Sequence, residues 1–299
     1  MHYVLDNWSF DPFVVVVAAL VVVHELGLAR LRARSVPQRT RRRRLLSLFF
    51  YAGLAVLLVA VSSPIDYWSS SYFFVHMAEH LLLAFYAPLL IVAGAPWLPL
   101  LFGLPVTWRR KVGRFVMLGP WSTALRAFGR FLISPWFAFA SFNAVMVLWH
   151  LPALFDTAEQ DQAIHVWLMH ASLFATGVLF WLLVVPSHPF RMRASTAFQV
   201  GAILGTNVVM FVLAMSMSIF SSHSWYDVYA HVPGVTFAPF ADQQLGAAIL
   251  WVCGDLWALP ALVIVLRRAM DREGSLADAV DRLFHREPGP DLREFRGLP

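Results

Sequence analysis

The stretch VHMAEHLLLAFYAPLLIVAGAPWLPLL, residues 75–101, begins with two histidines and a glutamate and continues as a long apolar run. Residues four apart lie on one face of an α-helix, so His76 and His80 would point their imidazoles the same way, with Glu79 beside them. Ionisable side chains inside a membrane helix are costly and commonly functional. The stretch therefore predicts a membrane helix whose polar end either binds a ligand or faces a wet, protein-lined interior.

The composition is that of an integral membrane protein. Of the 299 residues, 59% are hydrophobic and 14% are charged, whereas a soluble domain is about 45–50% apolar and about 25% charged. Residues 1–11 contain no Lys or Arg, so we expect a retained first membrane helix rather than a signal peptide. The single cysteine, Cys253, lies in an apolar segment, which excludes an internal disulfide and a thiolate metal cluster.

Seven apolar runs are long enough to cross a bilayer. They cover residues 12–30, 45–62, 75–101, 132–150, 165–186, 197–220 and 244–266. The third run is longer than a bilayer requires, and Pro88, Pro96 and Pro99 predict that it kinks or ends on its far side. We therefore predict an all-α fold, a polytopic membrane bundle of seven transmembrane helices.

The positions of the basic residues predict the orientation of this bundle. All 23 Lys and Arg residues lie in segments 30–44, 102–131 and 191–193 or after Leu266, and the intervening loops contain none. By the positive-inside rule the N-terminus is outside and the C-terminus is cytoplasmic. The basic charge thus reflects topology and attraction to anionic membrane lipids, and we expect no nucleic-acid partner.

Two further segments are predicted from composition. Segment 102–131 mixes basic and aromatic residues, which is typical of an interfacial amphipathic helix. Residues 1–270 are expected to form the membrane domain, and residues 271–299 a polar cytoplasmic tail that is partly disordered, with a short helix around 275–286.

Given this orientation, five histidines gather at one level of the predicted outer leaflet. With two methionines that end the sixth run, the candidate metal ligands are His76, His80, His150, His165, His170, Met215 and Met217. Imidazole and thioether together suit copper, and thioether favours the cuprous state. On an ideal α-helix His165 and His170 point about 140° apart, so we expect that they do not form a simple pair.

Other polar groups of the spans are open to more than one interpretation. Asp255 lies near the predicted midplane, and either proton handling or packing would explain it. Glu79 adds a possible charge beside the histidine pair. We expect His24 and Glu25, in the inner half of the first run, to be structural, and a cytoplasmic arginine could pair with them.

Three motifs in the chain resemble the CtaG family of polytopic assembly factors for caa-type cytochrome c oxidases. They are HMAEHLLL at 76–83 with APLL at 87–90 and GAP at 94–96, WHLPALFD at 149–156, and DQQLG at 242–246. The resemblance covers roughly residues 10–270. The family commonly has Gln where Glu79 stands and Glu where Met169 stands, so an acidic role at residue 169 is not expected.

The resemblance implies a multi-pass protein of the bacterial plasma (inner) membrane that helps to mature cytochrome c oxidase. We expect a metallochaperone that holds cuprous copper transiently and passes it to the catalytic subunit, rather than an enzyme. Two alternatives stay open. One is a copper or proton transporter that uses Glu79, Asp255 and Glu25 as a relay, and the other is a b-type haem protein with His80 and His170 as axial ligands. The oligomeric state is not predicted.

Overall fold

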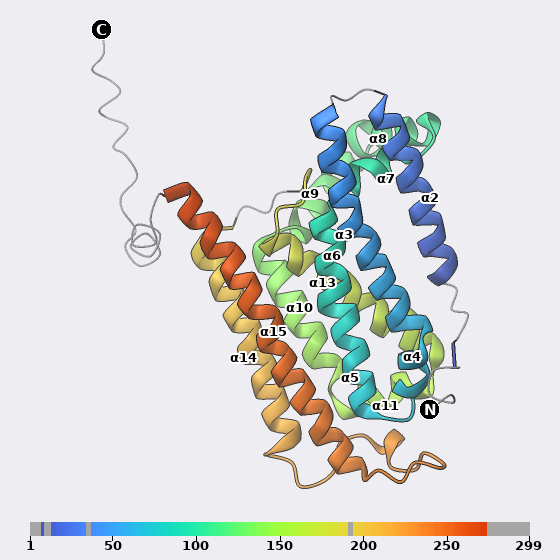
Figure 1. The fold of residues 1–299 in the computed structure, drawn as a ribbon, viewed down its shortest axis with the longest axis vertical. Helices are drawn as coiled ribbons and strands as arrows, with labels where there is room; N and C mark the ends of the chain where they lie inside the picture. Colours follow the sequence, from blue (N-terminus) through green and yellow to red (C-terminus); the bar gives the residue numbers. More distant parts are fainter. Residues whose placement is uncertain (1–6, 9–12, 34–36, 191–193, 274–299) are drawn as a thin grey trace.

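The computed structural model describes residues 7–8, 13–33, 37–190 and 194–273. Over these residues the secondary structure is helical and contains no β-strand, which confirms the predicted all-α class (Figure 1). The short helix predicted around residues 275–286 lies outside the described residues.

Six helical segments of the described chain are long and apolar enough to cross a membrane. Their bounds are α2 (Phe13–Arg32), α3 (Pro37–Ser62), the continuous run Phe73–Gly94, the continuous run Gln162–Val184, α14 (Thr196–Ser218) and α15 (Pro239–Glu273). Six of the seven predicted spans therefore correspond to long helices.

The predicted fourth span, residues 132–150, differs from a regular transmembrane helix. α9 (Ser122–Leu132) and α10 (Pro135–Trp149) meet at a bend of 64°, and the count becomes seven only if this bent pair is one span. Pro135 begins α10, and the Ser134 hydroxyl accepts a hydrogen bond from the Phe137 amide at 3.3 Å, so a new helix starts here. At about 1.5 Å per residue, the 15 residues of α10 reach only about 22 Å, less than the hydrocarbon core of about 30 Å.

The third span changes its helical winding along its length. It consists of α5 (Phe73–Leu81), a π-helical turn η1 (Leu82–Tyr86) and α6 (Ala87–Gly94). Ala95 then adopts a left-handed conformation with φ of 45°, and α7 (Trp97–Gly103) is a separate short helix. The prediction that the apolar run ends near its prolines is confirmed, and its end lies at Gly94 rather than at residue 101.

Small residues allow the closest helix contacts. A Cβ atom added to Gly27 on α2 would lie 1.8 Å from the Pro99 carbonyl oxygen on α7, and one added to Gly103 would lie 1.8 Å from the Val23 carbonyl oxygen. Membrane helices gain little from apolar burial alone, so close backbone packing of this kind holds them together. α2 and α7 are therefore locked in contact at two points.

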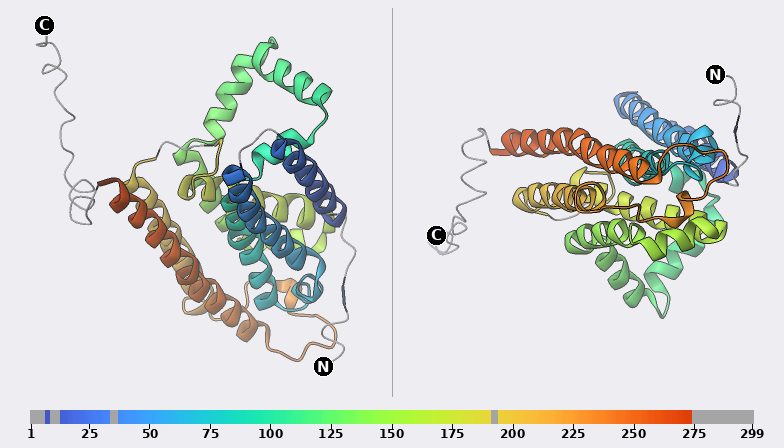
Figure 2. Two further views of the ribbon diagram at one scale, coloured as in Figure 1. Left: turned by 45° about the horizontal axis from the view of Figure 1, so that its top comes forward. Right: turned by 90° about the horizontal axis from the view of Figure 1, so that it is seen from below.

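The helices form a bundle with one projecting arm. α14 and α15 run side by side along one flank (Figure 1). α8 (Val106–Leu118) and α9 extend away from the other helices (Figure 2, left). α8 buries no residue. Segment 102–131 is thus helical as predicted, although as two helices, and its placement at a membrane interface stays a prediction.

An aromatic core positions the helices that carry the candidate site. Phe85 of η1 packs against Phe142 of α10 and Trp257 of α15, with ring centroids 5.0 and 4.8 Å apart. Phe142 stacks on Phe180 of α13 (Ala171–Val184) at 4.8 Å. Beyond this core, α4 (Pro64–Ser69), α11 (Pro152–Gln160) and η3 (Asp227–Tyr229) cover the end of the bundle where α5 begins (Figure 1).

Candidate metal centre

The segment η2 (His165–His170) is a π-helical turn between α12 (Gln162–Ile164) and α13. A π-turn hydrogen-bonds residue i to residue i+5 and so brings residues five apart onto one face. His165 Nε2 and His170 Nε2 consequently lie 2.7 Å apart. The expectation that these two histidines point apart is wrong, because it assumed regular α-helical winding.

The second histidine pair has the spacing that the sequence predicts. His76 and His80 lie four residues apart on α5, and their Nε2 atoms are 2.7 Å apart. The His76 and His80 rings meet edge to face with centroids 4.1 Å apart. Both side chains are buried, so this pair faces the interior of the bundle rather than lipid.

The two pairs meet across the bundle. The ring centroids of His76 and His165 are 5.3 Å apart, and those of His80 and His170 are 5.9 Å apart. Four imidazoles from α5 and η2 therefore form one cluster, in which His165 is the most exposed ring, at 15% of its side chain. Each ring presents its Nε2 atom to another imidazole at hydrogen-bond distance.

Two buried carboxylates flank the four imidazoles. Glu159 Oε1, on α11, lies 2.9 Å from His165 Nδ1 and 3.4 Å from His76 Nδ1. Glu79 Oε1 lies 3.5 Å from His170 Nε2. These contacts define two sets of three donor atoms within 4.8 Å of one another, namely His76, Glu159 and His165, and Glu79, His165 and His170.

Glu159 is the main site residue that the sequence analysis missed. Glu159 lies in a predicted outer loop, between the fourth and fifth predicted spans, and the predicted histidine ligands lie in the spans themselves. The available signal was the helical spacing from the aromatic residue Phe155, four residues earlier. In the structure Phe155 is fully buried and packs on His76, with ring centroids 4.8 Å apart. A carboxylate on the same face as a buried aromatic ring points toward the interior.

Tyr229 supports the cluster from η3. Its hydroxyl donates to the Ser69 carbonyl oxygen at 2.9 Å and lies 3.2 Å from His76 Nδ1. Burial raises the pKa of the Tyr229 phenol well above its ordinary value, and the nearby Glu159 carboxylate raises it further. The phenol is therefore a neutral hydrogen-bonding group at any physiological pH, and it orients the His76 ring.

His150 caps the C-terminal end of α10 and faces a sulfur atom. Its Nδ1 lies 2.6 Å from the Met146 carbonyl oxygen, which accepts a hydrogen bond from the ring in the neutral tautomer. His150 Nε2, which then carries the free lone pair, lies 3.3 Å from Met77 Sδ. The His150 and His80 ring centroids are 6.3 Å apart. Met77 thus places a thioether beside His150, and it was not among the predicted metal ligands.

The two predicted methionine ligands, Met215 and Met217, both lie on α14. Met217 Sδ lies 3.5 Å from the Tyr226 hydroxyl, which donates to the His150 carbonyl oxygen at 3.1 Å. Met215 is half-buried on α14. The contacts described for Met217 therefore connect it to the His150 backbone through Tyr226 and not to an imidazole.

The third motif has a structural role. The Asp242 carboxylate accepts hydrogen bonds from the Phe73 and Phe74 amides at 2.8 and 2.9 Å, and so caps the start of α5. Gln243 accepts from the Trp225 amide at 2.6 Å and donates to the Met217 carbonyl oxygen at 2.7 Å. Both side chains hold chain segments at the end of the bundle where α5 begins, and Asp242 sets the position of the helix that carries His76 and His80.

The other polar residues of the predicted spans, Asp255, His24 and Glu25, have described partners outside the histidine cluster. Asp255, which is exposed on α15, accepts a hydrogen bond from Asn207 at 3.2 Å. His24 Nδ1 lies 2.8 Å from the Tyr51 hydroxyl, and Tyr51 also donates to Glu25. Tyr51 is therefore a described partner of both His24 and Glu25, and their pairing with a cytoplasmic arginine stays a prediction.

The fold and the site define a polytopic membrane protein with a buried polyhistidine cluster at one end of its bundle. Residues 22–272 match the model of the family described as cytochrome c oxidase caa3 assembly factor (Caa3_CtaG), and the chain belongs to that family. The resemblance seen in the three motifs is thus confirmed.

The curated relatives that match are longer than this chain, and their names describe no activity. Uncharacterized proteins of Mycobacterium bovis and Mycobacterium tuberculosis are each 27% identical to the chain over 292 residues, and one of Mycobacterium leprae is 25% identical over 283 residues. The alignments cover 92% of this chain but only 41–42% of each relative, so the chain spans less than half the length of these proteins. No solved structure matches the chain.

Proposed function

We propose that this assembly factor binds copper at the histidine cluster and delivers it to the catalytic subunit of a cytochrome c oxidase. The observation that carries the proposal is the convergence of four imidazoles from two membrane helices, flanked by two carboxylates. Histidine is the commonest metal ligand in proteins, and a buried group of four with acidic neighbours has the composition of a cation site.

The donor set fits copper. Imidazole suits copper in both oxidation states, and the Met77 thioether beside His150 provides a soft donor for the cuprous ion. An ion buried without compensation costs several kcal/mol even after relaxation. The Glu79 and Glu159 carboxylates supply the compensating negative charge within the two donor sets.

The arrangement also suits a carrier, which must release its metal. His165 belongs to both donor sets, with Nδ1 toward Glu159 and Nε2 toward His170, so its ring lies between the two sets and an ion can pass from one set to the other. Exchangeable ligands of this kind favour transfer, whereas a closed tetrahedral site favours retention. The copper would pass within the membrane to an oxidase subunit docked beside the bundle.

The haem alternative has less support. Axial ligands must direct Nε2 at an iron atom from opposite faces of a porphyrin. The Nε2 atoms of His80 and His170 instead lie 2.7 Å from those of His76 and His165. A transport relay also has less support, because the described contacts of Glu79 and Asp255 involve His170 and Asn207 and do not form one chain.

We place the cluster at the outer face of a bacterial plasma membrane, with the N-terminus outside and the C-terminus cytoplasmic. The basis is the confinement of Lys and Arg to alternate loops. In this orientation α4, α11 and η3 cover the site from outside. The protein acts as a non-catalytic carrier.

Metal analysis of the purified protein tests the proposal. The protein loaded with cuprous copper under reducing conditions is expected to hold metal, and the double variant His76→Ala/His80→Ala is expected to lose it. His223→Ala/His231→Ala is the matched control, because both of these histidines are exposed in an outer loop. Equal copper in the two double variants would contradict the proposal.

A further inference from the structure

We propose that the protein has a binding site for one anionic phospholipid at the end of the bundle opposite to the histidine cluster. An apolar groove between α2 and α7 would hold an acyl chain, and an adjoining cavity lined by arginines would hold the phosphate headgroup. This site is independent of the proposed copper function.

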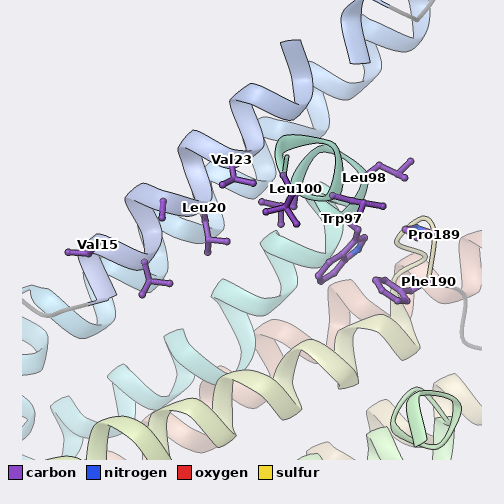
Figure 3. Close-up of a pocket in the computed structure, with 12 residues that line it drawn as sticks. Val15, Leu20, Val23, Trp97, Leu98, Leu100, Pro189 and Phe190 are labelled. Carbon is purple, nitrogen blue, oxygen red and sulfur yellow. The ribbon is translucent and has the colours of Figure 1, made fainter. Parts of the chain in front are cut away.

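The apolar groove lies on the side of the bundle, between α2 and α7 (Figure 3). Its volume is about 710 Å³, within the range of roughly 300–1,000 Å³ that is typical of small-molecule sites. Val15, Leu20 and Val23 of α2 form one wall, and Trp97 and Leu100 of α7 form the other (Figure 3). The stretch from Val15 to Val23 is about 12 Å long, so the groove can follow an extended chain.

The second cavity is lined by basic side chains rather than by apolar ones alone. It has a volume of about 300 Å³ and is lined by Arg39, Arg42 and Arg43 at the start of α3, together with His24 and His188. The described lining contains no Asp or Glu. Guanidinium groups bind phosphate through paired, charge-assisted hydrogen bonds, so this cavity matches an anionic phosphate group.

The groove and the cavity adjoin each other. Leu98 of α7 lines both, and the consecutive residues His188 and Pro189 line the cavity and the groove respectively. An occupant that fills both must have a compact anionic part joined to an apolar chain, as a phospholipid does. The cavity lies at the end of the bundle where the basic loops gather, which is the cytoplasmic side in the proposed orientation, where anionic lipids attract basic segments.

Not every arginine in this region is available to a lipid. Arg30 Nη1 donates to the carbonyl oxygens of Phe102, Gly103 and Leu104 at 2.7, 2.8 and 2.9 Å, and so completes the C-terminal end of α7. Arg41 and Arg44, in the same run as Arg42, do not line the cavity. Arg41 and Arg44 therefore serve as a matched control for Arg39 and Arg42.

Lipid titration of the full chain, followed by native mass spectrometry, tests the proposal. The probes are dioleoyl phosphatidylglycerol and dioleoyl phosphatidylcholine, which share their acyl chains and differ in charge. We expect one tightly bound phosphatidylglycerol in preference to phosphatidylcholine. Arg39→Gln/Arg42→Gln should weaken phosphatidylglycerol binding roughly tenfold or more, whereas Arg41→Gln/Arg44→Gln should change it less than about twofold.

A third variant tests the groove. Ala19→Trp fills the groove from α2 and should also displace the lipid, although it removes no charge. Circular dichroism and thermal unfolding in detergent report whether each variant is folded. Equal loss in the two arginine pairs, equal binding of the two lipids, or full displacement by soluble glycerol 3-phosphate would each overturn the proposal, as would unchanged binding to Ala19→Trp.

Discussion

His165 Nε2 and His170 Nε2 lie 2.7 Å apart although five residues separate them in the chain, because η2 is a π-helical turn. The same relationship places His170 beside Glu79 while His165 contacts Glu159. The local winding of one helix thus assembles both donor sets. π-turns are rare and are frequently found at functional sites.

Exchanging two neighbouring residues tests this winding. Met169→His/His170→Met keeps the composition but moves the imidazole to the position four residues after His165. On a regular α-helix this exchange would bring the two imidazoles onto one face, whereas on η2 it directs the imidazole away from His165. We expect copper affinity to fall at least about tenfold, as measured by competition with a cuprous chelator. Unchanged affinity would show that the segment is α-helical.

The shared depth of the histidines and the pairing of His76 with His80 were predicted, but the contact of His165 with His170 was not. Hydropathy and the positions of the arginines describe whole segments of about 20 residues. They therefore do not reveal a single π-helical turn within a segment. The same limit explains the fourth span, because an apolar window cannot detect the break between Leu132 and Pro135. Met77 faces His150 through tertiary packing, which periodicity on one helix does not reveal.

Glu159 should contribute to metal binding through its contacts with two imidazoles. Glu159→Gln removes the negative charge and keeps the size of the side chain, so we expect copper affinity to fall about 10–100-fold. Asp227→Asn removes an exposed carboxylate from the same end of the bundle and serves as the control. Equal affinities of these two variants in chelator competition would exclude Glu159 from the site.

Tyr229 is expected to be a positioning residue. Tyr229→Phe removes the hydroxyl 3.2 Å from His76 Nδ1 and keeps the ring, so copper affinity should fall about tenfold with little loss of fold. Because burial raises the pKa of this phenol, its ionisation should not shape the binding curve between pH 6 and pH 9. A change in the pH profile of copper binding on Tyr229→Phe in that range would contradict this role.

Copper binding should weaken as the pH falls. An imidazole must be neutral to bind a metal, so protons compete with copper at each histidine. As the pH is lowered stepwise from 7.5, isothermal titration with a cuprous source should show a lower affinity, and proton uptake on metal release, once the imidazoles begin to titrate. Copper release on acidification without any proton uptake would contradict an imidazole-based site.

Asp242 should stabilise the fold without contacting metal. Asp242→Ala removes the cap of α5 and should lower the free energy of unfolding by about 0.5–2 kcal/mol. Gln244→Ala is the control, because Gln244 is exposed and donates one 3.3 Å hydrogen bond to the Ser218 carbonyl oxygen. Thermal unfolding in detergent measures both variants, and equal midpoints would show that the cap is dispensable.

The most direct test of the central claim is the copper content of the oxidase itself. The oxidase would be purified from cells in which His76→Ala/His80→Ala replaces the wild-type protein, and from cells that carry His223→Ala/His231→Ala. We predict that the first preparation is depleted of copper relative to its haem and that the second has the normal ratio. A normal copper-to-haem ratio in the first preparation, with the variant protein present in the membrane at wild-type abundance, would contradict delivery through the histidine cluster.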